Sequence, residues 1–165
     1  MHLVIDIGNT SAKIAVFSQG EMKDMIRCSN QSLELDTFCQ IYPIRKGIWA
    51  SVISLSEEVQ QQLQQLPFPM MEFTYQTPIP IRNLYHTPQT LGVDRLAAVI
   101  AVYTAKPHHS ALVIDAGTCI TYDFIDEHGQ YQGGNISPGM EMRFKALHEF
   151  TSKLPKVEAS GETPS

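Results

Sequence analysis

The sequence has few of the residues that cross-link secreted proteins or bind zinc. Only three of its 165 residues are cysteines, at positions 28, 39 and 119, and none belongs to a Cys-x-x-Cys arrangement. Neither a disulfide framework nor a thiolate zinc site is therefore indicated. We expect the cysteines to be reduced thiols and the protein to be cytoplasmic.

Positive charge and long apolar runs are also scarce. The chain carries 12 Lys and Arg residues against 17 Asp and Glu residues, a formal net charge of -5, so a surface for nucleic acid is not expected. No apolar run approaches the roughly 20 residues of a membrane-spanning helix, and the first residues lack the pattern of a signal peptide. We therefore predict neither a nucleic-acid partner nor a membrane partner.

The chain is 43% hydrophobic, which is enough to form a packed core. Within it, one apolar segment occurs twice. Residues 3–8 read Leu-Val-Ile-Asp-Ile-Gly, and residues 112–117 read Leu-Val-Ile-Asp-Ala-Gly. Each segment predicts a buried strand that ends at a carboxylate, Asp6 or Asp115. The strand is then followed by a turn at a glycine, which leaves room for a close ligand.

Two explanations fit these turns. Asp-x-Gly after an apolar run also occurs at ordinary strand-to-turn junctions, so a single copy would indicate little. Two copies followed by a threonine, Thr10 and Thr118, favour phosphate binding. A hydroxyl and backbone N–H groups can hold phosphate oxygens while the carboxylate faces a hydrated divalent cation. We therefore predict one phosphate site between two related units.

Apolar periodicity divides the first part of the chain into strands and two helices. Strands are expected at residues 3–7, 12–17, 22–28, 47–52 and 70–73. One helix is expected from a cap at Ser32 to Ile41, and another over residues 57–66 with Ser54 or Ser56 as its cap. The glutamines of the second helix are expected to face solvent.

The rest of the chain repeats the opening pattern after a connecting helix. Residues 77–88 are rich in proline and predict an irregular loop, and residues 91–104 predict a helix that links the two units. Strands are then expected at residues 111–115, 120–125 and 131–136. A helix from residue 139 to about residue 150 follows, and the tail over 155–165 is polar with no hydrophobic period.

Duplicated three-stranded meanders with Asp-x-Gly hairpins resemble the superfamily of acetate and sugar kinases, actin and the heat-shock chaperone ATPases. Four segments, in their order and spacing, resemble more narrowly the type III pantothenate kinases. They are Asp-Ile-Gly-Asn-Thr at 6–10, Gly-Val-Asp-Arg at 92–95, Asp-Ala-Gly-Thr at 115–118 and Gly-Gly-Asn-Ile-Ser-Pro-Gly at 133–139. The Gly-x-Asp-Arg segment narrows the resemblance to this family, and the resemblance extends to about residue 154.

The resemblance implies an α/β fold of duplicated ribonuclease H-like, actin-like ATPase domains. The first domain would comprise residues 1–107 with the linking helix 91–104, and the second would begin with residues 108–165. Because the family continues with further strands and helices, we expect the second domain to be incomplete in this chain. The resemblance also implies a homodimer.

The activity implied is transfer of the γ-phosphoryl group of ATP to the primary hydroxyl of pantothenate, the first step of coenzyme A biosynthesis. Mg2+ and a monovalent cation, K+ or NH4+, are the cofactors expected with ATP. Phosphoryl transfer needs alignment and charge neutralisation more than covalent help, which agrees with the acidic turns. The alternative is a non-catalytic, nucleotide-binding regulatory or accessory protein on the same scaffold.

The resemblance assigns roles to individual residues. Asp94 matches the proton acceptor, Asp115 matches the ligand of the monovalent cation, and Asp6 lies where Mg2+ is expected. The nucleotide contacts implied are Asp6, Gly8, Asn9, Thr10, Lys13 and Thr118. The pantothenate contacts implied are Tyr85, Gly92, Val93, Asp94 and Arg95. The alternative for Asp94 and Arg95 is an ordinary helix N-terminus, with the carboxylate facing the helix dipole and the guanidinium solvated.

Overall fold

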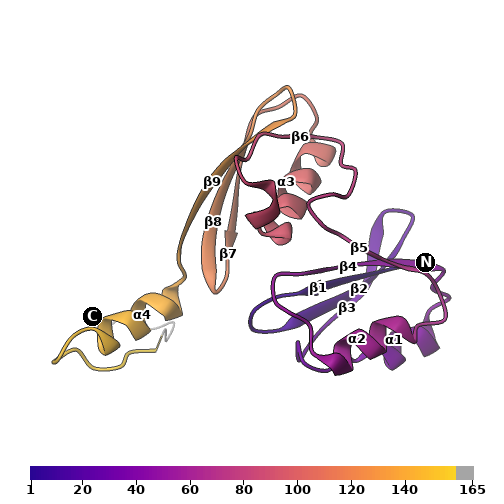
Figure 1. Ribbon diagram of the computed structural model, residues 1–165, viewed down its shortest axis with the longest axis horizontal. Helices are drawn as coiled ribbons and strands as arrows, with labels where there is room; N and C mark the ends of the chain where they lie inside the picture. The colour runs from indigo at the N-terminus through magenta and orange to yellow at the C-terminus, as the bar shows by residue number, and fades with distance from the viewer. Residues whose placement is uncertain (159–165) are drawn as a thin grey trace. The chain divides into compact units, whose positions relative to one another are not determined.

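The chain forms two compact units in the structure, a computed structural model that describes residues 1–158 (Figure 1). The first unit joins Met1–Ile79 to Thr87–Ala97, and the second joins Pro80–His86 to the chain from Ala98 onward. Residues 159–165, which belong to the predicted polar tail and to the predicted second domain, lie outside the described residues.

The first unit is built on a five-stranded mixed sheet with the strand order β3-β2-β1-β4-β5. Its strands are β1 (His2–Ile7), β2 (Ala12–Ser18), β3 (Glu21–Cys28), β4 (Lys46–Ser51) and β5 (Met70–Glu72). The first three form an antiparallel meander, whereas β4 runs parallel to β1 and β5 runs parallel to β4. The five strands predicted for this part of the chain are confirmed.

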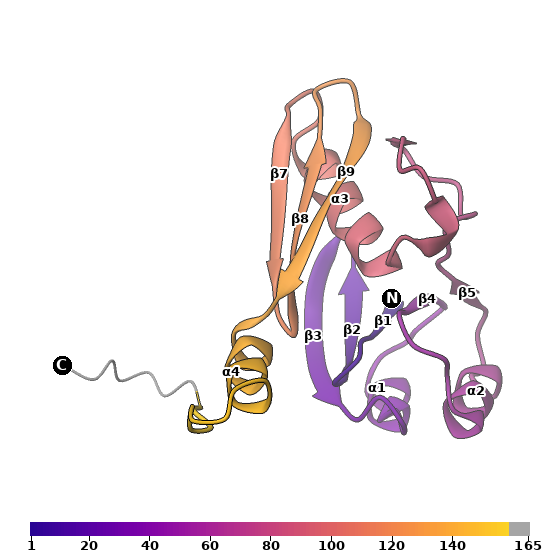
Figure 2. The same cartoon turned by 60° about the vertical axis from the view of Figure 1, so that its left-hand side comes forward.

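Two helices, α1 (Leu35–Ile41) and α2 (Glu57–Gln64), cover one face of this sheet (Figures 1 and 2). Each connects two strands that run in the same direction, a connection that needs a crossover. Alternate side chains of β1 and β2 are buried with Phe38 and Val59 in one hydrophobic core: Leu3, Ile5, Ile7, Ala12, Ile14 and Val16. The intervening side chains, Asp6 and Lys13 among them, therefore belong to the opposite face of the sheet.

The caps of the two helices differ in how well they match the prediction. Ser56 caps α2, because its Oγ accepts a hydrogen bond of 3.3 Å from the backbone N–H of Val59. The structure thus selects Ser56 over Ser54. The predicted cap at Ser32 is wrong, since α1 begins only at Leu35 and has no side-chain cap bond.

Gln62 on α2 explains why α1 begins late. Its side-chain amide donates to the Leu33 carbonyl at 2.9 Å, and its Oε1 accepts from the Leu33 N–H at 2.8 Å. Both polar groups of Leu33 are therefore committed to α2 before α1 starts, and the Leu33 side chain is buried in the core. The expectation that the glutamines of α2 all face solvent is wrong for Gln62.

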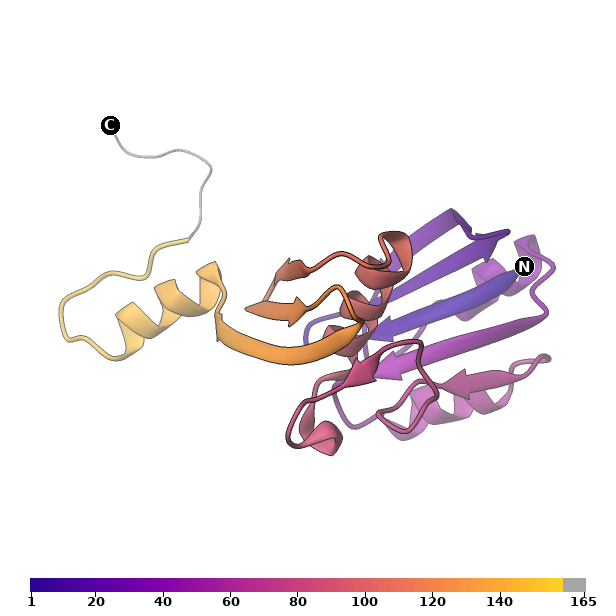
Figure 3. The same ribbon diagram turned by 90° about the horizontal axis from the view of Figure 1, so that it is seen from above.

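The second unit contains a four-stranded mixed sheet with the strand order β6-β9-β8-β7. Its strands are β6 (Arg82–Asn83), β7 (Ala111–Ala116), β8 (Cys119–Ile125) and β9 (Gln130–Pro138). The last three form the predicted antiparallel meander, and β6 runs parallel to β9. The stretch 77–88, expected to be irregular, therefore contains a short strand. Figure 3 shows β9 leading into α4 (Met140–Glu149).

The helix expected to link the units is α3 (Val93–Ala105), preceded by the short 3-10 helix η1 (Pro88–Thr90). The predicted helix is confirmed, but it begins at Val93 and not at the expected residue 91, because Leu91 is the C-cap residue of η1. The division between the two compact units falls inside α3, between Ala97 and Ala98, whereas the sequence placed the domain boundary after residue 107. Among the described residues, no helix is both long enough and apolar enough to cross a bilayer.

Candidate functional site

The first predicted turn brings a carboxylate and an ammonium group together. Asp6, near the end of β1, is the register partner of Lys13 on β2, and Lys13 Nζ lies 3.6 Å from Asp6 Oδ2. The two side chains are 44% and 47% exposed. An ion pair this open contributes little to stability, so both charges remain available to a ligand.

The turn between these strands is closed by its own backbone. The Gly8 N–H donates to the Ser11 carbonyl at 3.0 Å, and a Cβ on Gly8 would lie 3.3 Å from that same oxygen. Asn9 and Thr10 form the exposed tip of the turn. The predicted nucleotide contacts of the first turn are therefore neighbours in space, as expected.

The sequence did not indicate a role for Asn30, which forms hydrogen bonds to the backbone of this turn. Its Nδ2 donates to the carbonyl of Gly8 at 2.9 Å and to that of Asn9 at 3.0 Å. Asn30 comes shortly after β3, whose last residue, Cys28, is the register partner of Ala12. A register assigned between the second and third predicted strands would have placed Asn30 beside the turn.

A pocket of about 410 Å3 lies at the carboxyl end of β4 in the same unit. It is lined by the loop over Ser51–Ser54 and by Gln89–Val93, which leads into α3. The Val52 N–H donates to the Ile7 carbonyl at 3.1 Å, so this loop follows the end of β1 as well. Pockets beyond the carboxyl ends of parallel strands are common ligand sites.

Asp94 and Arg95 follow this pocket, in the first turn of α3. The Asp94 side chain is exposed, and its Oδ1 accepts a hydrogen bond of 2.8 Å from the Arg95 N–H. A Cβ on Gly92 would lie 2.5 Å from Asp94 Oδ1, so this carboxylate occupies space that only a glycine leaves open. Arg95 is only 6% exposed, which contradicts the alternative of a solvated arginine.

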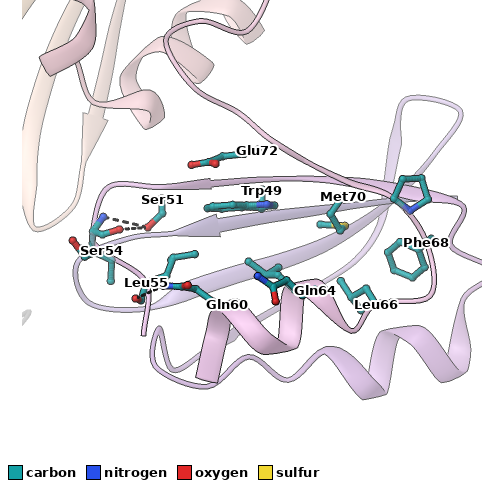
Figure 4. A pocket seen from close by; sticks show the side chains of 13 residues that line it. Trp49, Ser51, Ser54, Leu55, Gln60, Gln64, Leu66, Phe68, Met70 and Glu72 are labelled. Carbon is teal, nitrogen blue, oxygen red and sulfur yellow. Dashed lines mark hydrogen bonds between the residues drawn. The ribbon is translucent and has the colours of Figure 1, made fainter. Parts of the chain in front are cut away.

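A larger cavity in the first unit lies elsewhere. It has a volume of about 720 Å3 between β4, β5 and α2, with Trp49, Gln60, Gln64 and Met70 among its lining residues (Figure 4). Its rim includes Ser51, whose hydroxyl donates to the Ile53 carbonyl at 2.8 Å. None of the residues predicted to bind nucleotide or pantothenate lines this cavity. Its size alone therefore does not make it the site.

Tyr85, the predicted substrate contact in the second unit, is held from several sides. Its backbone N–H donates to Asn83 Oδ1 at 2.9 Å. Its ring stacks on the ring of Tyr131, with centroids 6.4 Å apart and planes 8° from parallel. A Cβ on Gly133, which has a φ of +97°, would lie 3.1 Å from Tyr85 Cδ2. Gly133 thus serves both a left-handed backbone position and close packing.

The second predicted turn follows β7 and is supported by the start of α4. Asp115 and Thr118 are both exposed, and the Gly117 N–H donates to the Cys119 carbonyl at 2.8 Å. Gly139, the cap residue of α4, donates its N–H to the Thr118 carbonyl at 3.0 Å. A Cβ on Gly139 would lie 2.2 Å from the Gly117 carbonyl oxygen, so only glycine permits this contact.

Neither acidic turn alone is a closed metal site. In the part of the chain that the structure describes, no three His, Cys, Asp or Glu side chains form a group that could hold a metal ion. Mg2+ in nucleotide sites is usually held by one or two carboxylates, water and phosphate oxygens. The Asp6 carboxylate, whose side chain is 44% exposed, is a donor of this kind.

Comparison with known proteins supports the resemblance seen in the motifs. Residues 2–165 match the family model for type III pantothenate kinase. The type III pantothenate kinase of Phocaeicola vulgatus is 60% identical over 165 residues, which cover 99% of this chain and 68% of the relative. That of Bacteroides fragilis is 54% identical, with the same coverage of both chains.

A solved structure extends the comparison to the fold. A Campylobacter jejuni protein assigned to the Baf family of transcriptional activators superposes with a TM-score of 0.57 at 24% identity, covering 99% of this chain and 68% of its own. That likeness concerns the α/β fold, with its two mixed sheets, and not the activity. The match of the family model over residues 2–165 shows that the chain belongs to the type III pantothenate kinase family.

Proposed function

We propose that the protein transfers the γ-phosphoryl group of ATP to the primary hydroxyl of pantothenate, the first step of coenzyme A biosynthesis. The observation that carries the proposal is the start of α3, in a chain of this family. There the exposed Asp94 carboxylate follows Gly92 and Val93, which line a pocket. A carboxylate beside the acceptor hydroxyl can take its proton as the new P–O bond forms.

The phosphates of the nucleotide bind at the β1–β2 turn. Gly8 closes the turn through its bond to Ser11, and Asn9 and Thr10 at the exposed tip present backbone groups of the kind that bind phosphate oxygens well. Lys13 supplies positive charge from the adjacent strand, 3.6 Å from Asp6. Asp6 is suited to hold Mg2+, which in kinases neutralises charge on the transferred group. Together these groups position the nucleotide.

The residues that we assign to pantothenate are Tyr85, Gly92, Val93, Asp94 and Arg95. Gly92 and Val93 line the pocket, and Arg95 provides positive charge to counter the carboxylate of the substrate. Tyr85, with its ring fixed against Tyr131, supplies a further contact. These assignments rest on the family's motif, and the burial of Arg95 supports a role other than that of a solvated surface residue.

The second turn serves the monovalent cation. Asp115 provides a carboxylate for K+ or NH4+, and Thr118 contacts the nucleotide. We further propose that residues 1–107 and 108–165 belong to two ribonuclease H-like, actin-like domains of common origin. Their meanders, β1 to β3 and β7 to β9, share antiparallel pairing. The protein acts as a homodimer in the cytoplasm.

The test is pantothenate-dependent release of ADP by the purified protein. We expect ADP release when ATP, Mg2+, K+ and pantothenate are present together. The rate should fall to background without pantothenate, and it should drop sharply when Na+ replaces K+. A protein that binds ATP but releases no ADP in response to pantothenate would instead be the regulatory or accessory protein named as the alternative.

A further inference from the structure

Asn30 lies just beyond β3 and is bonded to the turn that we assign to the nucleotide phosphates. Its two bonds, to the carbonyls of Gly8 and Asn9, are 2.9 Å and 3.0 Å long. An amide nitrogen carries two hydrogens, so one side chain can satisfy both carbonyls at once. The side chain is half-buried, which shields one of these bonds from competing water.

These two bonds also set the direction of two backbone N–H groups. In a trans peptide the carbonyl and the N–H point in opposite directions. The carbonyl of Gly8 shares its peptide group with the N–H of Asn9, and the carbonyl of Asn9 shares its group with the N–H of Thr10. Because both carbonyls point at Asn30, both N–H groups point away from it. Successive N–H groups on one side of a turn form a concavity that binds anions.

The closing backbone bond of the turn does not hold the two peptide groups that Asn30 contacts. This bond runs from the Gly8 N–H to the Ser11 carbonyl. Asn9 and Thr10 are exposed at the tip of the turn. Loss of the two Asn30 bonds would leave these peptide groups less ordered in the free protein, and ordering them when a ligand binds would reduce the affinity.

We propose that Asn30 is a positioning residue that preorganises the β1–β2 turn for the phosphates of ATP. This inference rests on the proposed function, which assigns the phosphates to that turn. Asn30 itself does not touch the reacting atoms, since its amide is committed to the carbonyl side of the turn. Its effect is therefore on nucleotide affinity, whereas a residue that only stabilises the fold would change the melting temperature and leave the affinity of the folded fraction unchanged.

The experiment compares Asn30→Ala with Asn30→Gln and with Ser29→Ala as a matched control. Ser29 belongs to the same segment, and its Oγ accepts from the Gln31 N–H at 3.1 Å without a bond to the turn. The dissociation constant for ATP is measured by calorimetry without pantothenate, and KM for ATP, KM for pantothenate and kcat are measured separately. Thermal unfolding is recorded for each variant.

We expect Asn30→Ala to raise the dissociation constant and KM for ATP about tenfold, with KM for pantothenate nearly unchanged. Asn30→Gln, which keeps the amide donor, should recover part of the affinity, and Ser29→Ala should bind ATP like the wild type. ATP affinity of Asn30→Ala within twofold of the wild type would overturn the inference. So would an equal loss of affinity in Ser29→Ala.

A measurement on the wild type covers the case in which Asn30→Ala does not fold. When ADP with Mg2+ is added, the backbone amide signals of Asn9 and Thr10 should shift in the 15N–1H spectrum, and unchanged signals would overturn the inference. The two proposals fail in different ways. If the protein binds ATP but releases no ADP in response to pantothenate, only the proposed function is wrong. If the protein is an active kinase and Asn30→Ala binds ATP with normal affinity, only the proposed role of Asn30 is wrong.

Discussion

The hydroxyl of Tyr131 donates a hydrogen bond of 2.5 Å to Oδ1 of Asp123, and both side chains are almost completely buried in the second unit. The ring of Tyr131 at the same time stacks on Tyr85, the proposed substrate contact. One buried tyrosine thus connects a carboxylate in the interior of its unit to a residue of the site. The polar bond stabilises the unit, and the stacked ring orients Tyr85.

The two functions of Tyr131 can be separated by substitution. Tyr131→Phe keeps the ring and removes the hydroxyl, so it should reduce the free energy of unfolding by about 1–3 kcal/mol, because a buried carboxylate loses a donor. KM for pantothenate should change little. Tyr131→Ala also removes the stacking partner and should raise that KM. Urea denaturation and steady-state kinetics measure both effects, and a Tyr131→Phe protein as stable as the wild type would contradict the first.

Gly92 controls where the carboxylate of Asp94 can lie. In Gly92→Ala the new Cβ would be 2.5 Å from Asp94 Oδ1, and this exposed side chain should rotate away. We expect kcat to fall by about 10- to 100-fold through loss of a positioned base. The free energy of unfolding should stay level or rise by about 0.5 kcal/mol, since alanine restricts the unfolded chain. A variant with normal kcat would show that the position of this carboxylate does not matter.

Gly139 should tolerate no side chain. A Cβ there would lie 2.2 Å from the Gly117 carbonyl oxygen and 2.5 Å from that of Thr118, and neither backbone atom can move as easily as a side chain. Gly139→Ala should therefore reduce the free energy of unfolding by about 1–3 kcal/mol. Gly117→Ala is the matched control, because its Cβ would meet only the Cys119 carbonyl at 3.9 Å. Equal unfolding energies for the two variants would contradict this account.

The β8–β9 turn should make stability depend on pH in the acid range. Hydrogen bonds, first of all from the backbone N–H of Gln130 at 2.8 Å, lower the pKa of Asp126 from its ordinary 3.8. A carboxyl whose pKa is lower in the folded state stabilises the protein above its unfolded pKa, and this contribution is lost as the pH falls through the folded pKa. Asp126→Asn should therefore lose less stability than the wild type between pH 7 and pH 3 in urea denaturation. Identical losses would contradict the assignment.

The sequence predicted the elements whose signal is local. The apolar residues that precede Asp6 and Asp115 lie in strands β1 and β7, as predicted. The helix that carries Asp94 also follows from its own apolar spacing. The apolar spacing of two, three or four residues was enough to select each element. The expected burial of the second segment is wrong, because Leu112 and Ile114 of β7 are 60% and 56% exposed.

Features that depend on distant partners could not be predicted in this way. The late start of α1 results from a bond between Leu33 and Gln62, 29 residues apart. The two-residue strand β6 exists because Arg82 pairs in parallel with Gln130. Asn30 was missed for the same reason, since its role depends on the register of β3 beside the turn.

The central claim is that Asp94 accepts the proton of pantothenate during phosphoryl transfer. The most direct test is kcat for pantothenate-dependent ADP release by Asp94→Asn, with Asp36→Asn as a control that removes the same charge from the first turn of α1. We predict a fall of about two to four orders of magnitude for Asp94→Asn, with unchanged ATP affinity and thermal stability, and wild-type turnover for Asp36→Asn. Near-normal turnover of a folded Asp94→Asn protein would contradict the claim.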